Sequence, residues 1–315
     1  MGLSFRLLWL KIIFTALNFI RRKATPTDYN CSETLRNSVD FSSLITPLML
    51  YPRIIPCLLI HKKGLVKTVK FKDPKYVGDP LNAVRIFNEK EVDELMVMDI
   101  DTTVLGDAPD YQLIRNLAAE CRMPLCYGGG IKTVEQTQMI FSLGVEKIAI
   151  SSAAIELPEL ISQVAKHVGS QSVVVILDVK KKVLSNKYEL YTRNASRNTG
   201  IDPLRFANDC EALGAGEIVI NSIDKDGTMN GYDFNIIDKI RDVVNIPITI
   251  LGGAGTLSDI GKLVAKYGIV GAAAGSMFVF KGKYRAVLIN YPNRVEKEEL
   301  IHKYFVENEA NHPIL

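Results

Sequence analysis

The sequence has few of the residues that disulfide frameworks and zinc sites require. It contains 5 cysteines and 4 histidines in 315 residues. No two cysteines form a CxxC pair, and the histidines are scattered along the chain. We therefore expect buried, inert thiols in a reduced, cytoplasmic protein that holds neither a metal ion nor another cofactor.

An excess of one charge and a long apolar run are also lacking. The chain has 38 basic and 35 acidic residues, a formal net charge of +3, and this balance argues against a nucleic-acid partner. A mostly apolar stretch at residues 7–20 is interrupted by Lys11 and Asn18. It is shorter than the roughly 20 residues that a membrane-spanning helix needs, so we predict no membrane span.

Residues 1–48 differ in composition from the rest of the chain. Basic residues flank the apolar stretch and a polar segment follows it. Such a segment fits a signal-like sequence, an interfacial helix or a stretch with no part in the fold. Because Met49 stands just before the regular pattern begins, we expect residues 1–48 to be disordered or a wrongly assigned start. Residues 49–315 are then the folded domain with a C-terminal tail.

From Arg53 onward, apolar stretches of strand length alternate with segments of helical periodicity. The predicted strands are 54–59, 94–99, 124–127, 147–151, 173–178, 217–221, 246–251 and 269–274. The predicted helices are 81–89, 111–121, 134–143, 158–167, 203–213, 234–243 and 257–267. Strands and helices that alternate over a span close to ~250 residues predict an α/β fold of the (β/α)8 TIM-barrel type rather than an open sheet.

The two halves of this pattern resemble each other. M-D-I-D-T-T from Met98 corresponds to S-I-D-K-D-G-T from Ser222, and G-G-G-I-K-T from Gly128 corresponds to G-G-A-G-T-L from Gly252. A repeat of roughly 120 residues is far too long for a solenoid. It predicts a barrel made of two half-barrels, with paired features at the carboxyl ends of its strands.

The apolar strand within residues 172–182 ends abruptly at Asp178. Barrels and open parallel sheets place their ligands at the carboxyl ends of strands, so Asp178 is the first candidate for acid–base chemistry. The corresponding stretch in the first half, residues 53–63, has Leu59 at the matching position. The sequence therefore predicts one catalytic carboxylate where a symmetric site would have two.

Glycine-rich turns follow predicted strands at residues 128–130 and 252–255. Glycine lets the backbone approach a ligand closely, and a following helix N-terminus attracts anions. Each turn is paired with a second small-residue turn, at 151–152 or 275–276. This symmetry favours a substrate with two phosphates, or the remnant of such a site, over simple tight turns. The candidate phosphate- or substrate-binding residues are Lys67, Gly129, Gly130, Ser151, Ser152, Asp226, Gly227, Gly252, Gly253, Gly275 and Ser276.

Other polar residues follow the predicted strands of the two halves. Asp99, Asp101, Asp224 and Asp226 can orient hydroxyls or move protons, but loop aspartates also form turns and caps. Asp226, in a D-G-T sequence, is the strongest of these candidates. Lys67 either lies over the same barrel mouth or is a solvated loop lysine.

Four charged residues stand at the opposite ends of the strands. Arg53, Glu94, Lys147 and Glu217 open the first, second, fourth and sixth predicted strands. They can form a neutral ring at the amino-terminal mouth of the barrel. The alternative is ordinary strand-end charge with a role in stability.

Together, these motifs resemble HisF, the cyclase subunit of imidazole glycerol phosphate synthase. The resemblance runs from Met49 to about Phe280 and rests on R-I-I-P-C-L, G-D-P-L-N-A, V-D-E-L-M-V-M-D-I, Y-G-G-G-I, L-G-A-G-E-I-V-I-N-S-I-D-K-D-G-T and G-G-A-G. It implies a barrel that docks a HisH-like glutaminase on its amino-terminal face and conducts ammonia to the opposite end. It further implies an ammonia gate formed by Arg53, Glu94, Lys147 and Glu217.

The resemblance also implies two catalytic aspartates, at the positions of Leu59 and Asp178, of which only one is present. Ser151 and Leu251 stand where the family has asparagine and serine. With I-P-C-L-L and V-K-T-V-K-F-K-D-P-K-Y, the chain resembles the WbuZ-type paralogues of surface-polysaccharide biosynthesis. Their likeness implies that ammonia passes to an ATP-dependent, WbpG-like enzyme that amidates a sugar.

Two alternatives remain open. The first is the HisF cyclase itself, which forms imidazole glycerol phosphate and AICAR from PRFAR and ammonia in histidine biosynthesis. The second is a non-catalytic scaffold that only activates a HisH-like glutaminase.

Overall fold

A computed structural model of the chain describes residues 51–183 and 185–306. The expectations for residues 1–48, and for the tail beyond residue 306, concern residues outside these ranges.

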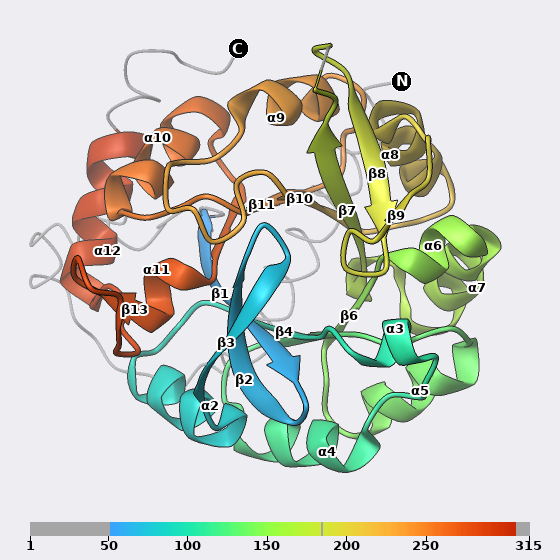
Figure 1. The fold of residues 1–315 in the computed structure, drawn as a ribbon, viewed down its shortest axis with the longest axis horizontal. Coiled ribbons are helices and arrows are strands. Elements are labelled where there is room, and N and C mark those ends of the chain that lie inside the picture. The colour runs from blue at the N-terminus through green and yellow to red at the C-terminus, as the bar shows by residue number, and fades with distance from the viewer. Residues whose placement is uncertain (1–50, 184, 307–315) are drawn as a thin grey trace, which may run out of the picture. The chain divides into compact units, whose positions relative to one another are not determined.

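Eight parallel strands form a closed barrel (Figure 1). They are β1 (Arg53–His61), β4 (Leu95–Asp99), β5 (Leu125–Gly128), β6 (Lys147–Ile150), β7 (Val173–Lys181), β10 (Glu217–Ser222), β11 (Ile248–Leu251) and β12 (Gly271–Ala274). Each pairs with the next in this order, and β12 pairs with β1, which leaves no open edge among them. The predicted (β/α)8 barrel is confirmed.

The helices that cover the barrel match the predicted ones to within a few residues. They are α2 (Pro80–Glu89), α4 (Tyr111–Glu120), α5 (Val134–Ser142), α7 (Glu159–Val168), α8 (Pro203–Ala212), α9 (Phe234–Arg241) and α10 (Leu257–Tyr267). Each buries one apolar stripe, as α7 does with Leu160, Ile161 and Val164, since only one side of such a helix faces the sheet.

Features in the two halves pair as the repeat predicts. Thr133 and Thr256 each form a capping box at the start of the helix that follows a glycine turn, α5 or α10. Strands β1 and β7 both extend beyond the barrel and pair there with antiparallel strands, β2 (Gly64–Val69) and β8 (Tyr188–Thr192).

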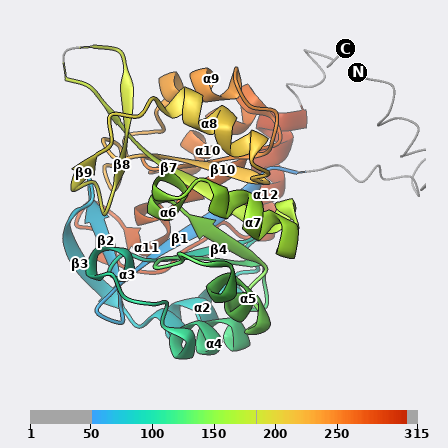
Figure 2. The same ribbon diagram turned by 90° about the vertical axis from the view of Figure 1, so that its right-hand side faces the viewer.

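Several elements were not predicted. The β2 strand continues into β3 (Lys72–Gly78), and β8 pairs with β9 (Arg197–Asn198). Both hairpins project from the same end of the barrel (Figure 2). The short and C-terminal elements are α3 (Thr102–Leu105), α6 (Ser152–Glu156), a 3-10 turn at Ser170–Ser172, α11 (Ser276–Val279), β13 (Phe280–Lys281), β14 (Ala286–Val287), α12 (Arg294–Ile301) and a π-helical turn at His302–Val306.

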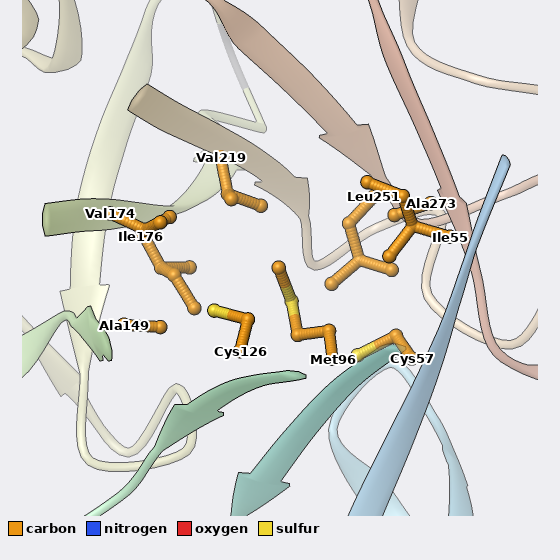
Figure 3. Close-up of a cluster of buried hydrophobic side chains, with 10 residues drawn as sticks. All are labelled: Ile55, Cys57, Met96, Cys126, Ala149, Val174, Ile176, Val219, Leu251 and Ala273. Carbon is orange, nitrogen blue, oxygen red and sulfur yellow. The ribbon is translucent and has the colours of Figure 1, made fainter. Parts of the chain in front are cut away.

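The inside of the barrel is filled by apolar side chains that converge from the surrounding strands (Figure 3). We name this group the bore cluster: Ile55, Cys57, Met96, Cys126, Ala149, Val174, Ile176, Val219, Leu251 and Ala273. Leu59 and Met98 pack against it. The interior is thus a packed core rather than an open pore, as is usual for this fold.

The thiols among the described residues are free. Cys57, Cys126 and Cys210 are buried and Cys121 is half-buried, while Cys31 lies outside the described ranges. Burial raises the pKa of Cys57 to about 11, so it stays a protonated, weakly reactive thiol at neutral pH. None of the helices between residues 51 and 306 that the structure describes combines the length and apolar character that a membrane crossing requires.

Candidate functional site

The carboxyl ends of the barrel strands surround a cavity of about 390 Å³. Leu59, Met98, Ile176 and Leu251 supply apolar lining, and Asp178 lies among them. Loops and hairpins that follow the strands supply the polar lining. The size and the mixture of apolar walls with a few polar groups are typical of a small-molecule site.

The carboxylate of Asp178 is held from two sides. Asn221 Nδ2 donates to Asp178 Oδ1 at 2.8 Å, and Ser151 Oγ donates to Oδ2 at 3.1 Å. Burial raises the pKa of Asp178 to about 6, although both hydrogen bonds oppose that shift. A carboxyl group with such a pKa can both accept and donate a proton near neutral pH.

Leu59 lines the same cavity from β1 and packs against the bore cluster. The structure therefore brings the two symmetric positions, Leu59 and Asp178, to one site. An alkyl side chain neither holds nor transfers a proton, so this symmetric pair of positions has a single carboxylate where the HisF resemblance implies two.

The glycine turns approach the cavity with backbone conformations that other residues rarely adopt. Gly129 and Gly130 have φ angles of 127° and 69°, and Gly252 and Gly253 have 92° and 113°. A Cβ atom at Gly129 or Gly253 would lie within 2.4 Å of a backbone oxygen. All four line the cavity, on turns related by the half-barrel repeat.

The paired small-residue turns line the cavity as well. Ser151 and Ser152 stand at the start of α6, and Gly275 and Ser276 at the start of α11. Ser152 Oγ accepts a hydrogen bond from the backbone N–H of Arg193, in the β8–β9 hairpin, at 3.3 Å. The predicted phosphate-binding residues are thus gathered at one end of the barrel; their role in binding phosphate remains a prediction.

Of the two alternatives for Lys67, the structure excludes the solvated loop lysine. It lies on β2, is only 6% exposed and lines the cavity. Its ammonium group donates to the backbone oxygen of Cys57 and occupies the space that a Cβ atom would take at Gly275. Burial lowers the pKa of Lys67. The β2–β3 hairpin carries this side chain inward, so the structure agrees with the first alternative, a lysine at the barrel mouth; its role in binding stays a prediction.

Three of the four additional aspartates support loops. Asp99 lines the cavity, but its Oδ1 accepts hydrogen bonds from two backbone N–H groups of the following turn. Asp101 pairs with His61 Nδ1 at 2.6 Å. Asp224 accepts from the backbone N–H of Lys181 at 3.0 Å and so holds the extension of β7. These are the turn-forming roles that loop aspartates commonly have.

Asp226 connects the cavity to the β2–β3 hairpin. Its Oδ2 accepts hydrogen bonds from Thr68 Oγ1 at 2.8 Å and from the backbone N–H of Phe71 at 3.2 Å. The adjacent Gly227 also lines the cavity, and its carbonyl oxygen accepts from Arg285 at 3.0 Å. In this structure Asp226 therefore fastens the hairpin over the cavity.

At the amino-terminal end, the four predicted charges form a closed ring. The Arg53 guanidinium donates to Glu94 and, at 2.8 Å, to Glu217. Lys147 Nζ lies 2.9 Å from a carboxylate oxygen of each glutamate. Burial alone would raise the pKa of Glu217, but the two cations outweigh it and the pKa is lowered. The ring is electrically neutral and lies at the amino-terminal ends of the barrel strands.

Asn221, which orients Asp178, was not among the predicted site residues. Its Oδ1 is buried and has no hydrogen-bond partner among the described residues, although Asn221 lines the cavity. An unpaired buried acceptor is costly. The available signal was a polar residue at the end of the apolar strand E-I-V-I-N, on the same strand face as Glu217.

Comparison with known proteins gives the family. Residues 53–285 match the family model described as histidine biosynthesis protein. The chain is 57% identical over 253 residues to a Vibrio vulnificus protein provisionally named imidazole glycerol phosphate synthase subunit hisF3; the match covers 80% of this chain and 97% of that protein. A Pseudomonas aeruginosa protein, provisionally named subunit hisF2, is 50% identical over 245 residues, which cover 78% of this chain and 97% of that protein.

A third relative, with lower identity, has a name that is not provisional. The imidazole glycerol phosphate synthase subunit HisF of Lactococcus lactis subsp. cremoris strain SK11 is 39% identical over 259 residues, which cover 80% of this chain and 100% of the Lactococcus protein. With the closed barrel and its half-barrel symmetry, these matches confirm the resemblance to HisF. The chain belongs to the histidine biosynthesis protein family, as a HisF-like barrel subunit.

Proposed function

We propose that this chain is the barrel subunit of a glutamine amidotransferase complex and conducts glutamine-derived ammonia to an enzyme that amidates a sugar in surface-polysaccharide biosynthesis. The observation that carries the proposal is the contrast between the two ends of the barrel. The charged ring at the amino-terminal end is complete, whereas Leu59 replaces one of the two carboxylates expected at the cavity.

The interior of the barrel supports an ammonia path. The ring has two donors and two acceptors and no net charge, so it can exclude ammonium ions and water while it is closed. Beyond it lies the bore cluster, which is apolar from strand to strand. Neutral ammonia is better tolerated in such surroundings than an ion, since burying an unpaired charge is very costly.

The cavity argues against efficient cyclase chemistry. A positioned acid or base contributes a factor of ~10² to 10⁴ to the rate of a reaction. Asp178 remains, but Leu59 and Leu251 present alkyl groups to the cavity where the HisF resemblance implies polar ones. The expected partners are a HisH-like glutaminase at the amino-terminal face and a WbpG-like, ATP-dependent enzyme at the other.

The runner-up is the HisF cyclase of histidine biosynthesis. It is favoured by the retained Asp178 with its two hydrogen bonds and by the full-length match to the Lactococcus HisF subunit. A scaffold that only activates the glutaminase is a third candidate. It is favoured by the apolar side chains that fill the inside of the barrel.

Transfer of labelled nitrogen tests the proposal. The purified chain is combined with the HisH-like glutaminase and the WbpG-like enzyme of the same genome, a nucleotide-activated acetamido sugar, ATP and glutamine labelled with ¹⁵N in its amide. We expect ¹⁵N in an acetamidino product, and loss of this product when the barrel subunit is omitted. In parallel, the chain and its glutaminase receive PRFAR and glutamine. Formation of imidazole glycerol phosphate within tenfold of the rate of the Lactococcus HisF complex would contradict the proposal.

Restoring the missing carboxylate should not restore the cyclase. We expect Leu59→Asp to give less than about 1% of the activity of an intact HisF protein, because Ser151 and Leu251 still differ from the implied site and a single general acid–base group accounts for only part of the loss. The assay is imidazole glycerol phosphate formation from PRFAR and ammonium. Full activity from this one change would show that the other departures are harmless.

A further inference from the structure

A threonine inside the barrel contacts the charged ring. Thr249 lies on β11 and is completely buried. Its hydroxyl donates to Glu217 Oε1 at 2.5 Å, the same oxygen to which Arg53 donates at 2.8 Å. A hydroxyl in the middle of the apolar strand I-T-I-L needs a partner when it is buried, and the carboxylate of Glu217 provides it.

The neighbouring strand makes room for this hydroxyl. Gly271 on β12 stands beside Thr249 in the strand register and beside Arg53 on its other side. A Cβ atom at Gly271 would lie 1.7 Å from Thr249 Oγ1. No rearrangement of a few tenths of an ångström relieves such an overlap. The two residues therefore form a matched pair, in which the glycine allows the threonine to reach the ring.

The two glutamates of the ring are consequently unequal. Glu94 accepts hydrogen bonds from Arg53 and Lys147 and, within the described ranges, from no other donor. Glu217 accepts from the same two cations and also from Thr249. If Glu94 moves aside, both cations keep a partner in Glu217. The carboxylate of Glu217 still accepts the hydrogen bond from the Thr249 hydroxyl on β11 and so keeps its orientation.

We propose that Thr249 is a positioning residue of the ring, which holds Glu217 as its stationary member and leaves Glu94 as the member that moves when the ring opens. This inference rests on the proposed ammonia path for its function, but the geometry of the ring can be tested without it.

The carboxyl carbons of Glu217 and Glu94 report on this role in the isolated full-length chain. In ¹³C NMR titrations, Thr249→Val should make Glu217 about tenfold weaker as an acid, because a hydrogen bond to the charged form is lost. Thr249→Ser, which keeps the hydroxyl, should restore it. Relaxation dispersion should detect millisecond motion at Glu94 but not at Glu217 in the wild type, and at both in Thr249→Val. Equal motion of both glutamates in the wild type, or an unchanged Glu217 titration in Thr249→Val, would overturn the proposal.

The complex tests the functional consequence. With the cognate glutaminase and the sugar-amidating enzyme, Thr249→Val should reduce transfer of glutamine nitrogen about tenfold and leave the reaction with added ammonium unchanged. Thr249→Ser should restore transfer. Thr137→Val is the matched control: Thr137 is equally buried, but its hydroxyl donates to the Thr133 carbonyl within α5. If the wild type transfers no glutamine nitrogen, the proposed function fails, while the NMR result still decides the role of Thr249.

Discussion

Replacing Lys147 with methionine should destabilise the fold by about 3 kcal/mol, within the ~3–5 kcal/mol typical when one partner of a buried ion pair is removed. The two glutamates that Lys147 joins are 4% and 6% exposed at their side chains, and the lysine itself is 18% exposed. Without it, Arg53 alone faces two buried carboxylates. The free energy of unfolding in urea at pH 7.5 measures the loss.

Coupling within the ring provides the control. Adding Glu94→Gln to Lys147→Met makes the ring neutral again, so the double variant should recover about 1–3 kcal/mol relative to the sum of the two single changes. Arg205→Met removes an exposed pair with Asp209, at 3.9 Å, and should cost less than about 0.5 kcal/mol. Additive losses in the ring would mean that the four residues act independently.

The loss of stability caused by Lys147→Met should depend on pH in a defined direction. The cations lower the pKa of Glu217 in the folded chain, so their contribution is present above the pKa of an unfolded glutamate and is lost as the pH falls through the lower, folded value. Removing Lys147 raises that folded pKa. The difference in the free energy of unfolding between wild type and Lys147→Met should therefore shrink as the pH falls and the glutamates become protonated. A difference that grows in acid would contradict the assigned electrostatics.

Asp178→Asn should make the protein more stable at pH 8 by about 2–3 kcal/mol. The folded pKa of about 6 lies above the ordinary aspartate value of 3.8, and one pKa unit corresponds to ~1.4 kcal/mol. The folded state therefore holds a proton that the unfolded state releases, so stability is lost as the pH rises from about 4 to 6. An asparagine has no proton to lose and keeps an acceptor for Asn221.

Urea unfolding of wild type and Asp178→Asn at pH 4.5, 6 and 8 checks this result, with Asp209→Asn as an exposed control. The advantage of Asp178→Asn should be largest at pH 8 and small at pH 4.5. A variant less stable than wild type at pH 8 would show that Asp178 supports the fold. The expected gain instead means that the chain carries a costly carboxylate at its cavity, as functional sites often do.

The barrel was predictable because its strands are buried on both faces. The run V-V-V-I-L before Asp178 is too short for a buried helix and too continuous for a half-exposed strand, which leaves a strand of a parallel sheet. The charges at the strand starts were predictable for the same reason: once the strands were placed, Arg53, Glu94 and their partners had to share one end. The spacing of these four residues along the sequence did not show which of them would form ion pairs with one another.

The β2–β3 hairpin was not predictable in this way. Its first strand buries Leu65, Val66, Lys67 and Thr68 in succession, and the register shifts twice along the pair. Bulges of this kind break the alternation on which strand prediction depends. Thr249 was hidden for a different reason: in an otherwise apolar strand, only its neighbours on the two adjacent strands show that its hydroxyl has a partner.

The attachment of Lys67 to this hairpin links the shape of the cavity to its charge. The hairpin is fastened at Asp226 through Thr68 and Phe71, and the adjacent Lys67 extends from it to the Cys57 carbonyl. The position of the hairpin and the positive charge at the barrel mouth are thus coupled: a displacement of the hairpin that breaks these hydrogen bonds would also move the Lys67 ammonium group, so the field that an anion meets in the cavity depends on where the hairpin lies.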